Sequence, residues 1–176
     1  EGVDVLLLSV GHDLPYLTGY EAMPLERLTM LVVPREGDAT LVVPRLEAPR
    51  VVAQPGVFGL RPWEETEDPI GIVAALVGGV STAAVGDQTW ARFVLSLQAS
   101  LPSARWEPAS KVVGPLRVVK DPHEVEALRA AREVIIPLET SFFAIDGVQK
   151  LLETISLLSD RIGHRLHVRV LPTLYD

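Results

Sequence analysis

Short aliphatic runs of strand length alternate along the chain with segments of helical spacing, and this alternation constrains the fold more than any other feature. Residues 3–10 form a continuous aliphatic run that ends at Gly11, and residues 82–85 form a second run that ends at Gly86. Such runs, bounded by turn residues, are typical of buried strands. Residues 89–100 place their apolar side chains at helical spacing. Strands and helices in alternation predict an α/β fold, a mixed β-sheet flanked by helices.

A turn cluster between two further apolar runs predicts a β-hairpin. Residues 28–33 and 39–43 are apolar, and Pro34, Arg35, Glu36, Gly37 and Asp38 separate them. Gly37 tolerates the positive φ that a tight turn needs.

Three helix starts are marked by capping residues. Asp68-Pro69 combines an N-cap with a proline at the first helical position. Asp121-Pro122-His123-Glu124 adds a glutamate that completes a capping box. Asp146 and Gln149 form a second box, at the start of an apolar stripe over residues 148–162.

The remaining segments are shorter. Residues 46–53 are predicted to form a short helix, and residues 58–63 a short strand. Residues 166–171 alternate in polarity and predict a last short strand. Residues 12–20 contain Pro15 and are interpreted as a loop.

Composition excludes several classes of protein. The 176 residues contain no Cys, so disulfide frameworks and thiol nucleophiles are absent. The hydrophobic fraction of 48% and the net charge of -7 exclude intrinsic disorder. An acidic chain repels the phosphate backbone, and no apolar run reaches the length that spans a bilayer. We therefore expect no nucleic-acid and no membrane partner, and the missing Cys is compatible with a cytoplasmic location.

Residues capable of catalysis or metal binding are few. His164 and His167 are three residues apart, but in a strand this spacing places them on opposite faces. Ser9, His12 and Asp13 follow one another closely, without the G-x-S-x-G motif of a nucleophile elbow. A polar loop explains these three better than a catalytic triad. We therefore predict no catalytic residue and no metal ligand.

Two tyrosines and an arginine form the most informative binding group. Tyr16, Tyr20 and Arg27 lie close in sequence, and an arginine can hold a carboxylate in bidentate fashion while tyrosines donate hydroxyl hydrogen bonds. The alternative is that the tyrosines pack against the hairpin and that Arg27 is solvated.

The order of several motifs resembles the creatinase and Xaa-Pro peptidase family, which includes prolidase and aminopeptidase P. G-V-D-V-L-L-L-S (residues 2–9) and P-Y-L-T-G-Y (15–20) precede the hairpin. D-Q-T-W-A-R-F-V-L-S-L-Q-A-S-L-P (87–102) and P-L-R-V-V-K-D-P-H-E-V-E-A-L-R-A-A (115–131) follow it. The resemblance covers residues 2–131. It implies a creatinase/prolidase N-terminal-like domain over residues 1–115, and a linker with the first helix of the usual catalytic domain over residues 116–131.

In this family the catalytic domain holds two divalent metals, Mn, Co or Zn, which activate the hydroxide that attacks the Xaa-Pro bond. Residues 132–176 do not match that domain, and their acidic residues do not fall in its motifs. We interpret them as an atypical, short helical C-terminal segment, left by an internal deletion, a frameshift or a replaced terminus. The resemblance thus implies no metal ligand in this chain, with both metals expected only in a full-length member. Because residue 1 is Glu and not Met, we also expect that something precedes it.

The resemblance makes Arg27 a candidate for binding the substrate. The creatinase branch uses an arginine shortly after a Y-x-x-G motif to hold the substrate carboxylate, and Arg27 lies eight residues after Gly19. Arg27, Tyr20 and His12 are therefore the candidates for the edge of the substrate site in an intact enzyme.

Three hypotheses for function follow. The first is an N-terminal, non-catalytic domain of an Xaa-Pro dipeptidase or aminopeptidase-like metallopeptidase, which is inactive alone. It would serve homodimerisation and the restriction of proline-containing dipeptide or peptide substrates. The second is a stand-alone interaction module that has lost the peptidase half and binds partners through the stripe over residues 148–162. The third is a small-molecule binder that uses Arg27 and the tyrosines.

Overall fold

The computed structural model describes residues 2–52, 54–130, 133–139, 148–149, 151–153, 155–157, 159–160 and 167–173. The chain divides into two compact units, Glu1–Val118 and Val119–Asp176.

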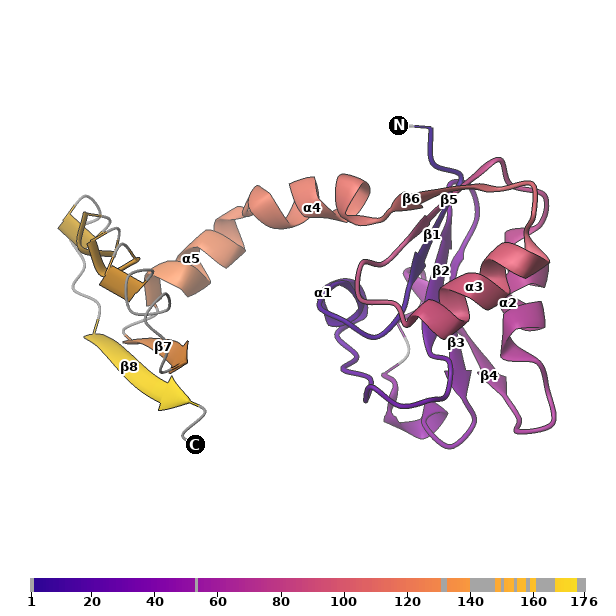
Figure 1. The fold of residues 1–176 in the computed structure, drawn as a ribbon, viewed down its shortest axis with the longest axis horizontal. Helices are drawn as coiled ribbons and strands as arrows, with labels where there is room; N and C mark the ends of the chain where they lie inside the picture. Colours follow the sequence, from indigo (N-terminus) through magenta and orange to yellow (C-terminus); the bar gives the residue numbers. More distant parts are fainter. Residues whose placement is uncertain are drawn as a thin grey trace. The chain divides into compact units, whose positions relative to one another are not determined.

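The first unit is built on a mixed sheet in the order β4-β3-β2-β1-β5-β6 (Figure 1). Its strands β1, β2, β3, β4, β5 and β6 are Val5–Leu8, Met30–Pro34, Ala39–Pro44, Phe58–Trp63, Thr82–Val85 and Arg105–Pro108. Strand β2 runs antiparallel to both β1 and β3. The pairs β1–β5, β5–β6 and β3–β4 are parallel. Strand β1 therefore lies inside the sheet, between an antiparallel and a parallel neighbour.

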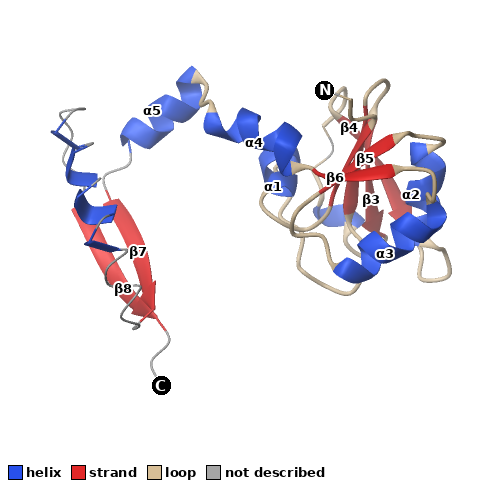
Figure 2. Ribbon diagram, turned by 45° about the horizontal axis from the view of Figure 1, so that its top comes forward, coloured by secondary structure: helices blue, strands red, loops and turns tan. Residues whose placement is uncertain are grey.

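Helices cover both faces of this sheet (Figure 2). They are α1, Asp13–Thr18; the 3₁₀ turn η1, Ala48–Arg50; α2, Pro69–Val77; α3, Ala91–Ser100; and α4, Ser110–Val118. Alternate residues of β1 enter opposite layers of the core, as the two-residue period of a strand requires. Leu8 packs with residues of α1 and α4, whereas Leu7 packs with residues of α2 and α3.

The predicted strands and the hairpin are confirmed. The runs over residues 58–63 and 82–85 are β4 and β5. The hairpin is formed by β2 and β3, with Leu31 opposite Leu41. The N-cap of α2 is also confirmed, because the Asp68 carboxylate accepts a hydrogen bond of 3.0 Å from the Ile70 N–H.

The prediction of a loop over residues 12–20 is wrong, because Asp13–Thr18 form α1. Pro15 is the third residue of this helix, where a backbone N–H would have no partner within the helix, so its missing donor costs nothing. The helix ends at Gly19, whose φ of 69° is one that glycine adopts without strain. The helix predicted over residues 46–53 is only the 3₁₀ turn η1.

Two elements of the first unit are missed by the sequence analysis. Strand β6 is an edge strand whose residues are partly or fully exposed, so it lacks a strong apolar signal. Helix α4 contains Gly114 and Pro115, which normally disfavour a helix interior. Packing stabilises it nevertheless, since Val113 is buried and the Ala109 N–H donates to the Val85 carbonyl oxygen at 2.8 Å.

The second unit contains α5, Pro122–Ala130, and a parallel pair of strands, β7, Glu133–Glu139, and β8, His167–Thr173. The predicted capping box of α5 is confirmed. The Glu124 N–H donates to Asp121 Oδ1 at 2.7 Å, and the Asp121 N–H donates to Glu124 Oε2 at 3.0 Å. The predicted strand over residues 166–171 corresponds to β8, although Leu166 is outside the described residues.

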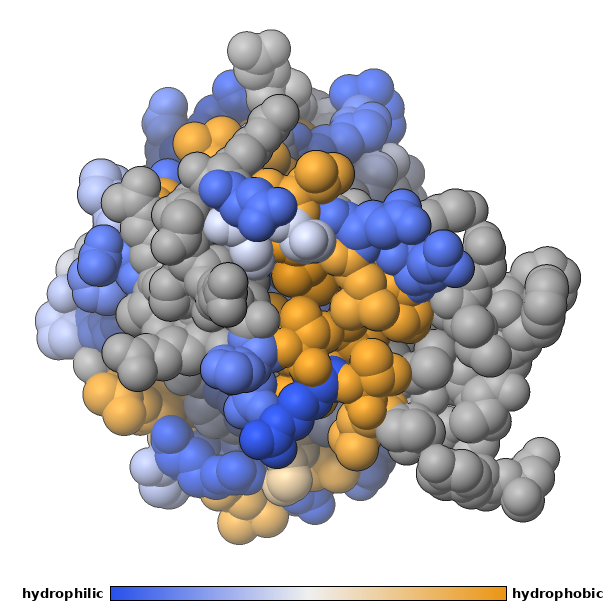
Figure 3. All heavy atoms as spheres, turned by 90° about the vertical axis from the view of Figure 1, so that its left-hand side faces the viewer, coloured by the Kyte–Doolittle hydropathy of each residue, from blue (hydrophilic) through white to orange (hydrophobic). Residues whose placement is uncertain are grey.

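The apolar stripe of the second unit is described in part. The described residues between 148 and 160 are helical, whereas Asp146 of the predicted capping box is outside the described residues. Several large apolar side chains of this unit are more than one-third exposed: Ile135, Leu151, Leu152, Leu157, Val170 and Leu171. Figure 3 shows apolar residues gathered among hydrophilic ones on the side that faces the viewer. Within the described part of the chain, no helix has the length and apolar character to cross a membrane.

Candidate functional site

A crevice opens where the chain leaves β1 and β5 in opposite directions. These two strands are parallel neighbours, so their carboxyl ends lie at the same edge of the sheet. After β1 the chain enters α1, whose Leu14 packs on one face of the sheet. After β5 it enters α3, whose Phe93 packs on the other face. Such a topological switch point is where ligands commonly bind in open α/β sheets.

A cavity of about 200 Å³ lies at this point, between the β1–α1 loop, the β5–α3 loop and α4. We call it the switch-point cavity. Its lining includes Ser9 and Gly11 from the first loop and Asp87 and Thr89 from the second. A neighbouring, more open cavity of about 390 Å³ shares part of this lining and extends toward Trp90.

The two loops are joined directly at the cavity. The His12 backbone N–H donates to Gln88 Oε1 at 3.1 Å. Gly11 makes this approach possible, because a Cβ at its position would lie 2.7 Å from the same Gln88 oxygen. The β1–α1 and β5–α3 loops are thus held in contact at the floor of the crevice.

Helix α4 closes the cavity from a third side. Ser110, Gly114 and Arg117 line it and are spaced i, i+4 and i+7, so they lie on one helical face. Arg117 Nη1 lies 3.1 Å from Asp13 Oδ1, and the Tyr16 hydroxyl donates to the Leu116 carbonyl oxygen at 3.3 Å. Helices α1 and α4 are therefore tied together next to the cavity.

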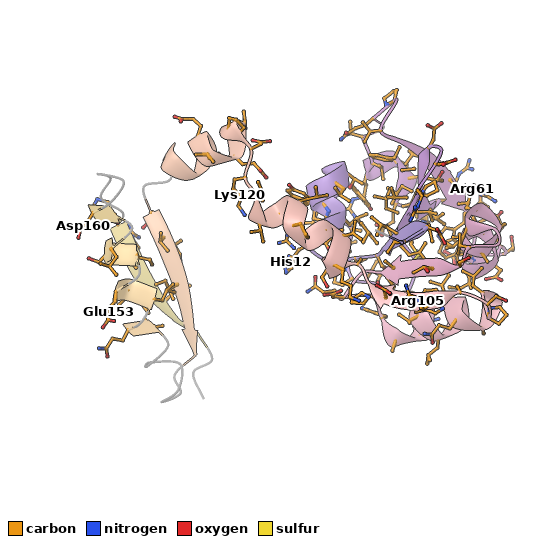
Figure 4. All side chains as sticks on the ribbon, turned by 90° about the horizontal axis from the view of Figure 1, so that it is seen from above. His12, Arg61, Arg105, Lys120, Glu153 and Asp160 are labelled. Carbon is orange, nitrogen blue, oxygen red and sulfur yellow. The ribbon has the colours of Figure 1, made fainter. Side chains whose placement is uncertain are left out.

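Of the three candidate residues from the sequence analysis, one lies at these cavities. His12 lines both cavities and is exposed. Figure 4 shows it on the opposite side of the first unit from Arg61. Neither Tyr20 nor Arg27 is among the described residues that line the two cavities. Their role at the edge of a substrate site stays a prediction.

Arg27 lies on the surface in an ion pair. Its Nε is 3.0 Å from Glu65 Oε1, and the two side chains are 33% and 63% exposed. A pair this open to solvent holds its partners weakly, so the Arg27 guanidinium can exchange Glu65 for another carboxylate.

Tyr20 is buried in the core. It packs in the same cluster as Leu41 and Val43 of the hairpin. This agrees with the alternative interpretation, in which the tyrosines pack against the hairpin. Its hydroxyl donates to Glu47 Oε2 at 2.8 Å. Burial, together with the hydrogen bond to the Glu47 carboxylate, raises the pKa of Tyr20 to about 12. Tyr20 thus remains a neutral hydrogen-bond donor throughout the physiological range.

Gln88, Thr89 and Arg117 are site residues that the sequence analysis missed. Gln88 and Thr89 follow β5 in G-D-Q-T, just as His12 and Asp13 follow β1 in G-H-D. The sequence signal that could have identified Gln88 and Thr89 is the presence of polar residues after two predicted strands. If these strands are parallel neighbours, such residues lie at the same edge of the sheet. No comparable sequence pattern marks Arg117, because only the position of α4 in the fold brings Arg117 to the site.

The described residues contain no group of three or more His, Asp or Glu side chains arranged to hold a metal ion. His167 is exposed in β8, whereas His164 is outside the described residues. The residues that the structure describes thus do not fit a two-metal centre.

The first unit coincides with a known domain family. Residues 1–119 match the family described as Creatinase/Prolidase N-terminal domain. The chain is 38% identical over 138 residues to a probable dipeptidase PepE from Mycobacterium tuberculosis, a match that covers 76% of this chain and 36% of that protein. The chain therefore spans about one-third of the length of the curated relatives it matches.

Solved structures agree with this match. The dipeptidase PepE from Mycobacterium ulcerans aligns with a TM-score of 0.66 and 38% identity, over 74% of this chain and 36% of that chain. The Creatinase/Prolidase N-terminal domain of an X-Pro dipeptidase from Streptococcus pyogenes aligns with a TM-score of 0.54, over 65% of this chain and 88% of that chain. At 22% identity the second likeness shows the fold alone. The chain belongs to the creatinase/prolidase N-terminal domain family and is homologous to the N-terminal part of dipeptidases such as PepE.

Proposed function

We propose that this chain acts as the non-catalytic, N-terminal domain of an Xaa-Pro dipeptidase or aminopeptidase-like metallopeptidase. The observation that carries the proposal is the agreement between the matched residues, 1–119, and the compact unit that ends at Val118. In this proposal the domain contributes to homodimerisation and restricts the size of proline-containing substrates. The hydrolytic step belongs to a two-metal domain, and no step of it is assigned to residues of this chain.

The first test is hydrolysis of the dipeptide Gly-Pro by the 176-residue chain, followed as release of free proline. We expect no release above the buffer rate, with or without Mn²⁺, because the described residues provide no metal-ligand cluster. A full-length family dipeptidase assayed in parallel serves as the positive control, and circular dichroism shows that the chain is folded. Metal-dependent release that a chelator removes would overturn the non-catalytic assignment.

The dimerisation part of the proposal is supported by three exposed apolar side chains in one short segment of the chain. Leu46, Val52 and Val57 lie on the segment that connects β3 with β4, and they are 70%, 78% and 54% exposed. Apolar side chains that are exposed near one another in a chain can contact another protein. We call these three residues the β3–β4 patch.

Analytical ultracentrifugation tests this part separately. We expect a mass twice the 19.2 kDa of the chain. Val52→Asp should shift the population toward monomer, because a buried unpaired carboxylate is costly. Leu95→Asp is the matched control, since Leu95 is 65% exposed on α3, outside the patch, and should leave the mass unchanged. A monomeric unmodified chain would contradict dimerisation and leave the peptidase assignment in place.

A further inference from the structure

We propose that the switch-point cavity binds one ring of a neutral, polyhydroxylated ligand of the monosaccharide class. The polar groups of Gln88 and Thr89 bind its hydroxyl groups, and Trp90 contacts the apolar face of its ring. The proposal goes beyond the proposed function, because it concerns binding by the first unit and involves no hydrolysis.

The place and volume of the cavity favour a small ligand. The cavity lies at the carboxyl ends of two parallel strands, where open α/β sheets commonly bind ligands. Its volume of about 200 Å³ is enough for roughly six water molecules. It is below the range of roughly 300–1,000 Å³ that drug-sized ligands occupy. A single sugar ring has this scale, whereas a nucleotide or an oligosaccharide is too large.

The uncharged groups of the lining provide both acceptors and donors of hydrogen bonds. The Ser9 hydroxyl donates to the Thr29 carbonyl oxygen at 2.9 Å, so it remains an acceptor for a ligand. Gln88 Oε1 accepts from the His12 N–H, and no described residue accepts a hydrogen bond from Gln88 Nε2. The Gln88 amide therefore offers N–H donors to a ligand. A hydroxyl group both donates and accepts, so neighbouring hydroxyls of a sugar satisfy both kinds of group.

Thr89 provides an independent indication of a polar ligand. Its Oγ1 is buried and has no hydrogen-bond partner among the described residues. A buried hydroxyl without a partner is costly, and a hydroxyl group of a ligand removes that cost. Gly114 leaves space on the α4 wall, because a Cβ at its position would meet no atom within 4 Å. The cavity therefore combines an unsatisfied polar atom with room for a ligand.

The charges of the lining disfavour an ionic ligand. The Asp13 carboxylate is already paired with Arg117, at 3.1 Å. The other carboxylate of the lining, that of Asp87, is exposed and repels anions. Because it is open to solvent, it binds a single cation only weakly. It can still accept hydrogen bonds from hydroxyl groups, so a neutral ligand with several hydroxyls matches this lining best.

An aromatic side chain lies beside the site. Trp90 lines the neighbouring cavity, which shares Gly11, His12 and Gln88 with the switch-point cavity. The indole is stacked on Phe93, with ring centroids 6.1 Å apart, and Trp90 remains 41% exposed. The stack holds the indole in place, and its exposed part is open to the C–H face of a sugar ring.

NMR titration of the isotope-labelled 176-residue chain with D-glucose, D-galactose and D-mannose tests the proposal. We expect at least one of these sugars to shift the backbone amides of Gly11 and Thr89 and the indole N–H of Trp90 in a saturable manner. Tetrahydropyran, which has the ring without hydroxyl groups, should cause no saturable shift. No saturable shift with any of the sugars, or an equal response to tetrahydropyran, would overturn the proposal.

Charged forms of the sugar that binds test whether the ligand is neutral. The uronate should bind about tenfold more weakly than the sugar, because its carboxylate meets Asp87. The amino sugar should bind within about threefold of the neutral form, since Asp87 is exposed. Binding of either charged form about tenfold more tightly than the neutral sugar would refute a neutral ligand.

Thr89→Val locates the site. The variant should weaken sugar binding by about tenfold, because the ligand loses a hydrogen bond to a buried hydroxyl. Its melting temperature should not fall, since Oγ1 has no partner among the described residues. Thr66→Val, in an exposed turn, is the matched control and should leave the affinity unchanged. Unchanged affinity in Thr89→Val, or an equal loss in Thr66→Val, would rule out this site.

Trp90→Ala tests the aromatic contact. We expect sugar binding to weaken by about fivefold, because the apolar face of the ring loses its contact with the indole. The melting temperature of this variant shows whether the stack on Phe93 is needed for folding. Unchanged affinity in a folded Trp90→Ala chain would contradict the proposed position of the ring.

Discussion

Leu7→Ala is expected to lower the free energy of unfolding of the first unit by about 3 kcal/mol. Leu7 is fully buried in β1, between Val32 of β2 and Val85 of β5. Truncation removes the apolar contacts of the side chain and leaves a cavity that the surrounding strands cannot close, since each is fixed by its own hydrogen bonds. Urea unfolding followed by Trp fluorescence measures the change, because Trp63 lies in the same core cluster.

Leu95→Ala is the matched control for this prediction. Leu95 is 65% exposed on α3, so its truncation should change the free energy of unfolding by less than about 0.5 kcal/mol. Similar losses in the two variants would contradict the position of Leu7 at the centre of the sheet.

The Tyr20–Glu47 pair should make the stability of the chain fall in alkaline solution. The folded-state pKa of Tyr20 is raised to about 12, from an ordinary value near 10. Between these values the unfolded chain loses the phenol proton while the folded chain keeps it, so deprotonation favours unfolding. The stabilisation is fully present below about pH 10 and is lost as the pH rises to about 12, at a cost of about 3 kcal/mol.

Tyr20→Phe provides the measurement. At neutral pH the variant should be less stable by about 2 kcal/mol, because the buried Glu47 carboxylate loses a hydrogen bond of 2.8 Å. Above pH 10 the difference from the unmodified chain should shrink, since the variant has no phenol at this position to titrate. Denaturant unfolding at several pH values follows both effects.

Tyr16→Phe is the control for Tyr20→Phe. Tyr16 is 43% exposed, and its hydroxyl donates to a backbone carbonyl at 3.3 Å. Its replacement should cost less than about 1 kcal/mol and should leave the alkaline fall intact. A Tyr20→Phe chain with an unchanged pH profile would show that another group causes the fall.

Local patterns predict most of the first unit. Strands β4 and β5 are signalled by aliphatic runs between turn residues, and α2 by the Asp68 cap. Two of the errors involve proline. Pro15 was placed in a loop, but it lies where a helix needs no donor. Pro115 lies in a helix that the sequence analysis missed, and packing of Val113 stabilises that helix.

The candidate site depends on tertiary structure to a greater extent than the individual strands and helices do. His12 was recognised, but its partner Gln88 is 76 residues away in the chain. Asp13 and Arg117 are 104 residues apart. No local sequence pattern connects such pairs, because only the order of the strands in the sheet and the position of α4 bring them together. Tyr20 and Arg27 were grouped by nearness in sequence, and their role at the edge of a substrate site stays a prediction.

The position of β1 in the sheet has a consequence for synthesis on the ribosome. Strand β1 pairs with β2 within a few tens of residues, but Val5 meets its parallel partner only at Ala83. At about 5–20 residues per second, roughly 4 to 16 s pass before β5 is made. During that interval the backbone edge of β1 that faces β5 is unpaired, and open strand edges are sites of aggregation. Nascent chains that pause before Thr82 are therefore the ones most in need of a chaperone.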